Sequence, residues 1–152
     1  MVAGLWWSAR VARQQASVAR DSMLSLLHRA SDGPPSAPLL LTLARVKLNV
    51  EAAPSEALAA IERAYALAPG DPDILAERVA CLLFNVRMAE SITAAQGAWP
   101  LLREPAAQVN VAVLAWAAAR LIDDEKTAAH WAEQALTAYI ALPPGDSALN
   151  LH

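Results

Sequence analysis

The chain has 152 residues, enough for one domain with a buried core, and carries a net charge of −3. Apolar residues make up 56% of it and aromatic residues only 5%. Its 36 alanines and 22 leucines far outnumber its 10 valines, 5 isoleucines and 4 threonines. Alanine and leucine favour helices, whereas strands favour β-branched and aromatic residues. The composition therefore predicts an all-α protein and argues against a sandwich, a barrel or a doubly wound sheet.

Charge is unevenly distributed along the chain. Residues 1–50 hold six basic and two acidic side chains, while residues 51–152 hold six basic and thirteen acidic ones. A basic front on an acidic body suits self-association or an oppositely charged partner, although ordinary scatter explains it equally well. The basic residues do not interleave with aromatic ones, so we expect no nucleic-acid partner.

Cysteine usage and hydropathy bear on the compartment. The one cysteine, Cys81, excludes an intramolecular disulfide and a cysteine-based zinc cluster, and we expect it to be a small buried hydrophobe. Residues 1–13 lack the pattern of a signal peptide. The longest apolar stretch, 106–122, is too short and too polar for a membrane span. The sequence therefore predicts a cytoplasmic protein.

Prolines and glycines divide the chain into segments in which apolar residues recur at spacings of three and four, as in helices. Asp71 is an expected N-cap, with Pro72 at the first helical position. Turns of two to five residues require antiparallel neighbours. The segment 105–122 is apolar nearly all round and is expected at the centre. The seven expected helices span about 4–30, 37–50, 54–68, 71–85, 88–99, 105–122 and 125–142.

Two observations indicate an internal repeat. Residues 66–71, Ala-Leu-Ala-Pro-Gly-Asp, recur 75 residues later as Ala-Leu-Pro-Pro-Gly-Asp at 141–146. In this register Ala57 corresponds to Ala132, and Ile61 to Leu136. Helix starts at about 37, 71 and 105 are 34 residues apart. The chain therefore contains about three helix–turn–helix units.

At 38–71 the chain resembles the tetratricopeptide repeat (TPR), a 34-residue helical hairpin. Ala57, Ile61, Ala64 and Pro69 fall at the family's small, bulky, small and proline positions of the second helix. The departures are also clear. In the first unit, Arg45 stands where the family has glycine or alanine, unless a one-residue insertion in the turn puts Ala44 there. In the second unit, Arg103 stands at the proline position. In the third unit, Tyr139 replaces the last small residue.

The resemblance implies a short right-handed stack of about three TPR-like hairpins at 37–146. The helix at 1–30 would be an amphipathic cap or arm, and 147–152 a tail. Small residues at helix crossings allow the helix axes to approach closely, and stacking completes the core that no single unit can make.

The implied function is binding of a peptide or partner helix on a concave face lined by the first helix of each pair. The leading hypothesis is a non-enzymatic adaptor or small chaperone. The alternatives are an obligate structural subunit or homo-oligomer, and an accessory domain of an enzyme. The expected lining residues are Thr42, Arg45, Asn49, Asp73, Glu77, Phe84, Asn110 and Arg120.

The sequence carries no catalytic or metal-binding pattern. Its three histidines show no pair at helical spacing, and no Gly-x-Ser-x-Gly, P-loop or Gly-x-Gly-x-x-Gly occurs. Asp123-Asp124-Glu125 lacks the spaced carboxylates and the glycine of a calcium loop and is interpreted as a solvated turn. We therefore expect no enzyme, no cofactor and no metal.

The five tryptophans divide into two groups. Trp99, Trp116 and Trp131 lie in expected helices and are interpreted as core residues. Trp6 and Trp7 are adjacent, so their side chains point about 100° apart on a helix and one face cannot easily bury both. With Leu5 and Arg10 nearby, this end is a candidate contact for a protein partner or a second copy. Ordinary packing or a frayed terminus, and contact with a membrane surface, are the alternatives.

Overall fold

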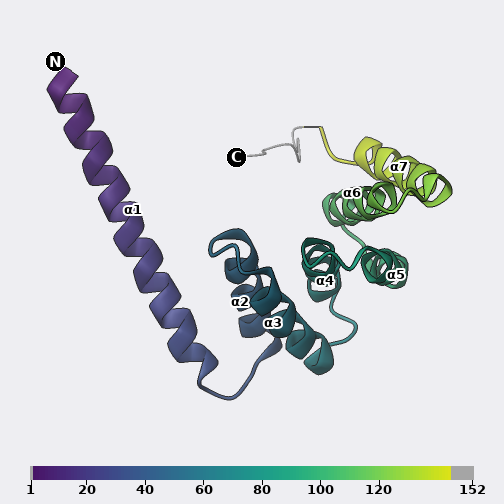
Figure 1. Cartoon of the computed structure of the whole chain (residues 1–152), viewed down its shortest axis with the longest axis horizontal. Coiled ribbons are helices and arrows are strands. Elements are labelled where there is room, and N and C mark those ends of the chain that lie inside the picture. The colour runs from purple at the N-terminus through teal and green to yellow at the C-terminus, as the bar shows by residue number, and fades with distance from the viewer. Residues whose placement is uncertain (1, 145–152) are drawn as a thin grey trace. The chain divides into compact units, whose positions relative to one another are not determined.

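A computed structural model describes residues 2–144, with the side chains of residues 2–9, 26, 30 and 31 left aside. Over these residues the protein is helical and has no strand, which confirms the all-α prediction. Expected and observed helix bounds agree to within two residues. The elements are α1 Val2–Ser31, α2 Ala37–Asn49, α3 Pro54–Leu67, α4 Pro72–Phe84, α5 Met88–Ala98, the 3-10 turn η1 Trp99–Leu101, α6 Pro105–Leu121 and α7 Glu125–Ile140 (Figure 1).

The chain divides into two compact units. The first contains α1 and ends at Pro35, and the second begins at Ser36 and contains α2 to α7. α1 is one uninterrupted helix of 30 residues, about 45 Å long at 1.5 Å per residue. The expected tail at 147–152 and the last two residues of the expected repeat region lie outside the described residues.

Capping side chains fix where several helices begin. Ser36 Oγ accepts a hydrogen bond from the Leu39 amide at the start of α2. Asp71 Oδ1 accepts from the Asp73 amide at 2.9 Å, which confirms the expected N-cap of α4. Prolines occupy the first or second positions of α2, α3, α4 and α6, where the missing N–H leaves no helical bond unmade.

The turn within each hairpin contains one residue with a positive φ. These residues are Ala52 (51°), Val86 (62°) and Asp123 (56°). In the second and third hairpins the next amide reaches back five residues, from Arg87 to the Leu82 carbonyl and from Asp124 to that of Ala119. This 6→1 bond is the Schellman pattern of helix ends.

The first of these turns is one residue longer than the second. The Ala53 amide reaches back six residues, to the Lys47 carbonyl. Before the turn, the fully buried Ala44 corresponds to Val79, 35 residues on, whereas after it Ala57 corresponds to Ser91, 34 residues on. The extra residue explains why Ala44 is buried and Arg45 exposed.

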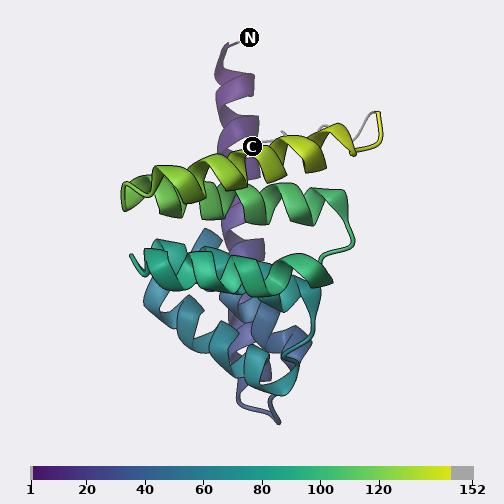
Figure 2. The same ribbon diagram turned by 90° about the vertical axis from the view of Figure 1, so that its right-hand side faces the viewer.

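Successive hairpins α2–α3, α4–α5 and α6–α7 pack on one another in chain order (Figure 2). α4 contacts α2 and α3 of the preceding hairpin, and α6 likewise contacts α4 and α5. Within this unit α2, α4 and α6 form one layer, while α3, α5 and α7 form the other (Figure 1). α6 packs against three helices, but Val113, Trp116 and Leu121 are exposed, so its apolar surface is not covered all round as expected.

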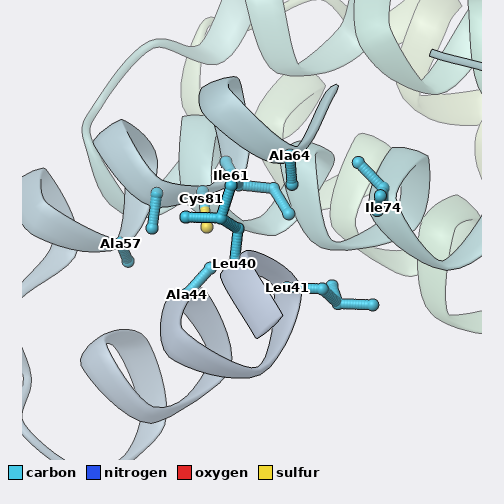
Figure 3. Packing of buried hydrophobic residues seen from close by; sticks show 9 residues of the cluster. Leu40, Leu41, Ala44, Ala57, Ile61, Ala64, Ile74 and Cys81 are labelled. Atoms are coloured by element: carbon cyan, nitrogen blue, oxygen red, sulfur yellow. The ribbon is translucent and has the colours of Figure 1, made fainter. Parts of the chain in front are cut away.

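Small residues lie where paired helices cross. Ala57, Ile61 and Ala64 of α3 are fully buried against α2 and α4, as Figure 3 shows. Their counterparts 34 residues later, Ser91, Ala95 and Ala98, are fully buried as well. The burial pattern therefore repeats between α3 and α5 with the spacing expected from the sequence.

The 75-residue register between α3 and α7 does not extend to burial. Ala132 and Leu136 are exposed, although their sequence counterparts Ala57 and Ile61 are buried. The residues of α7 that pack inward are Ala128, Trp131 and Ala138. The physical reason is the position of the turn: counted from the positive-φ residues Ala52 and Asp123, the buried Ala57 corresponds to the buried Ala128, 71 residues later.

The tryptophans expected in the core differ in burial. Trp131 is buried, and its ring meets that of the partly buried Trp99 edge-on, with centroids 5.3 Å apart. Trp116 is exposed, contrary to the core interpretation, because it lies on the side of α6 away from the buried Val111 and Ala118.

Candidate partner-binding face

The helices α2, α4 and α6 present a row of side chains directed away from the buried core. On α2 the exposed positions alternate with buried ones at helical spacing, so Thr42 and Arg45 lie opposite Leu40. The same alternation occurs on α4 and α6. We call the combined surface the first-helix face; it consists of Thr42, Arg45, Asn49, Asp73, Glu77, Phe84, Asn110, Val113 and Arg120.

An ion pair joins the rows of α2 and α4. Arg45 Nε donates a hydrogen bond to Glu77 Oε2 at 3.1 Å. The Arg45 side chain is 48% exposed, while that of Glu77 is only 14% exposed. Two of the residues expected to line a partner site are thus brought together, and the arginine keeps a surface that a ligand can reach.

The ends of α2 and α4 contribute residues of different chemistry. Asn49 is the last residue of α2 and Phe84 the last of α4, and both are exposed. Phe84, the chain's one phenylalanine, is 58% exposed and offers a large apolar surface. Asp73 lies in the first turn of α4, where the helix dipole favours a carboxylate.

On α6 the face includes a residue that the sequence reasoning missed. Asn110 and Arg120 are exposed as expected, and Arg120 pairs with Glu125 across the turn to α7. Val113 is 46% exposed and was not among the expected residues. It lies three residues after Asn110 and seven before Arg120, so its helical spacing was a sufficient signal.

The expected amino-terminal contact is described only in part. Arg10 is exposed on α1. Leu5, Trp6 and Trp7 lie within the helix, but their side chains are outside the described residues.

A separate cleft of about 380 Å³ lies among α3, α4, α5 and η1. The Arg78 guanidinium lies 4.6 Å from the centre of the Tyr65 ring, and its Nε donates to Glu62 Oε1 at 2.8 Å. Glu90, also at the cleft, pairs with Arg87. Charged groups at this cleft and on the first-helix face are alike paired within the chain; what distinguishes the first-helix face is the exposed aromatic ring of Phe84. No sequence pattern predicted this cleft.

Cys81 is buried as expected, and burial raises the pKa of its thiol to about 12, with a smaller contribution from Glu77. Within residues 2–144, no three His, Cys, Asp or Glu side chains are grouped as metal ligands would be. None of the helices in this range has the length and apolar character needed to cross a membrane.

Comparison with known proteins gives no significant match to a family model, a curated protein or a solved structure.

Proposed function

We propose that residues 37–144 form a TPR-like, non-enzymatic interaction module, an adaptor or small chaperone, whose first-helix face binds a peptide or a partner helix. The observation that carries this proposal is the alignment of exposed side chains on α2, α4 and α6, with the α2 and α4 rows joined through Arg45 and Glu77. A cytoplasmic location belongs to the same proposal.

Three features support the TPR-like assignment. Each first helix after α2 contacts both helices of the hairpin before it. The buried positions of α3 recur in α5 after 34 residues. The three hairpin turns share a positive-φ residue at corresponding places. These features are what a stack of like units requires, because each unit completes the core of the next.

The chemistry of the first-helix face suits a peptide with mixed character. Phe84 and Val113 offer apolar surface on neighbouring helices, and desolvating such anchors supplies much of the affinity in protein interfaces. Arg45 and Asn110 offer donors for backbone carbonyls or a carboxylate. The ligand class we propose is therefore a short amphipathic segment with apolar side chains and polar groups that accept hydrogen bonds.

The test is selection from a random peptide library against the immobilised full chain. We expect the selected peptides to bind the double variant Phe84→Ala, Val113→Ala at least tenfold more weakly, a loss of about 1.4 kcal/mol. The control is Leu136→Ala, Ile140→Ala, which removes exposed apolar side chains from α7 and should leave affinity unchanged. Equal losses in both variants, or a loss confined to the control, contradict the proposal.

A second candidate, an obligate subunit or homo-oligomer, is favoured by one observation. α7 exposes Leu136, Tyr139 and Ile140, and exposed large apolar side chains gathered on one helix often mark an interface. For this candidate, Leu136→Glu with Ile140→Glu should reduce the mass measured by light scattering. An unchanged mass would remove it.

A further inference from the structure

The sequence of α1 contains an uninterrupted heptad pattern. Starting at Val2, apolar residues recur at alternating spacings of three and four along the whole helix, and no such position is polar. They occupy the first and fourth positions of four successive heptads, the a and d positions of a coiled coil. We call this line the α1 seam; its members are Val2, Leu5, Ala9, Ala12, Ala16, Ala19, Met23, Leu26 and Ala30.

A strict seven-residue period has a specific structural meaning. The mean spacing between successive apolar positions is 3.5 residues, slightly less than the 3.6 residues of a helical turn. A straight helix cannot keep such a line facing one way, whereas two helices that wind around each other can. Apolar residues also lie beside this line, at Val11, Val18, Leu24 and Leu27. The seven-residue period of the line itself therefore suits pairing with another helix.

No other helix of its own unit covers the described side chains of the α1 seam. Ala12, Ala16 and Ala19 are exposed, and Met23 is 49% exposed. Helices in water gain most of their stability from packing an apolar face. An uninterrupted 30-residue helix with an exposed apolar seam is thus suited to pairing.

We propose that α1 pairs with α1 of a second copy of this chain as a parallel, two-stranded coiled coil. In a parallel pair each residue of the α1 seam packs against the same residue of the second copy. The larger side chains near the helix ends therefore pack against each other, and so do the central alanines. Close approach along the alanines brings the two backbones near the lower end of the usual helix separation.

The charges beside the α1 seam favour the parallel orientation. Arg13 and Arg20 both occupy e positions. In a parallel pair they lie next to Ser8 and Gln15 of the second copy, at the g positions, so no like charges meet. In an antiparallel pair the e positions of the two helices face each other, which sets arginine against arginine. The proposed pairing does not depend on the first-helix face, and it would give each dimer two such faces.

The test compares the full chain with two variants of equal charge change. Ala12→Glu with Ala19→Glu places carboxylates in the α1 seam, and the control, Gln14→Glu with Ser17→Glu, places them outside it. Glutamate is a good helix former, so circular dichroism should show similar helix content. We expect light scattering to give twice the chain mass for the wild type and the control, and the single-chain mass for the seam variant. A monomeric wild type, or a seam variant that stays dimeric, overturns the proposal.

Orientation is tested by cysteine cross-linking. Met23→Cys places two thiols opposite each other only in a parallel pair, and mild oxidation should give a covalent dimer. Gln14→Cys, on the far side of the helix, should not. Failure of Met23→Cys to cross-link overturns the parallel arrangement. Peptide affinity of the seam variant measures the first-helix face separately, so the two proposals fail independently.

Discussion

Replacing Val86 by glycine should stabilise the protein. Val86 has a φ of 62°, where the Cβ of an L-residue approaches the following carbonyl oxygen, at a cost of roughly 1–2 kcal/mol. Its side chain is 76% exposed, so little packing is lost on truncation. The amide that donates to the Leu83 carbonyl is retained. Glycine costs about 0.5–1 kcal/mol through the greater freedom of the unfolded chain. The middle values of these two ranges leave a net gain of about 0.75 kcal/mol.

The assay is urea unfolding followed by circular dichroism. With an m-value of about 2 kcal/mol per M, the midpoint should rise by roughly 0.3–0.5 M without a change in slope. Val50→Gly is the matched control. Val50 also follows a helix and is solvent-exposed, but its φ is −108°, so glycine there should lower the midpoint. If both substitutions shift stability in the same direction, the strain assigned to Val86 is absent and the reasoning fails.

Three further predictions concern the buried residues. Cys81 should resist thiol reagents at pH 8 in the folded protein and react after unfolding, and rapid labelling of the folded form would contradict this. Its pKa is about 12 in the folded protein and ordinarily 9.0, so the contribution of Cys81 to stability should be constant below pH 9 and fall as the pH rises from there toward 12. Ala64→Leu should overpack a fully buried crossing and cost about 1–3 kcal/mol in urea unfolding, whereas Ala66→Leu, on the exposed side of α3, should change stability by less than about 0.5 kcal/mol. Ser91→Ala should cost about 1 kcal/mol, because the buried Ser91 hydroxyl donates to the Val79 carbonyl at 2.9 Å; a neutral result would show that this bond adds nothing.

The helices were predictable because residues close in the sequence determine where each helix begins and ends. Asp71 with Pro72 marks the start of α4 through a side-chain cap and a residue without an N–H. The burial of Ala57 and Ala64 followed from the spacing of small residues. Such signals act over a few residues, so a single sequence displays them.

The features that escaped prediction depend on contacts between distant segments. The exposure of Trp116 and Leu136 is decided by which sides of α6 and α7 have neighbours, and no local pattern states that. The pairing of Arg45 with Glu77 needed the one-residue difference between hairpin turns, which places Arg45 outward. Val113 could have been found from its spacing to Asn110, but its apolar character suggested the core instead.

The central claim, that the first-helix face binds the partner, is tested most directly by nuclear magnetic resonance of the labelled chain titrated with a selected peptide. We predict that the amide shifts will change along α2, α4 and α6, most strongly near Glu77, Phe84 and Val113. Changes concentrated on α7 or at the cleft around Arg78, with the first-helix face unaffected, would contradict it.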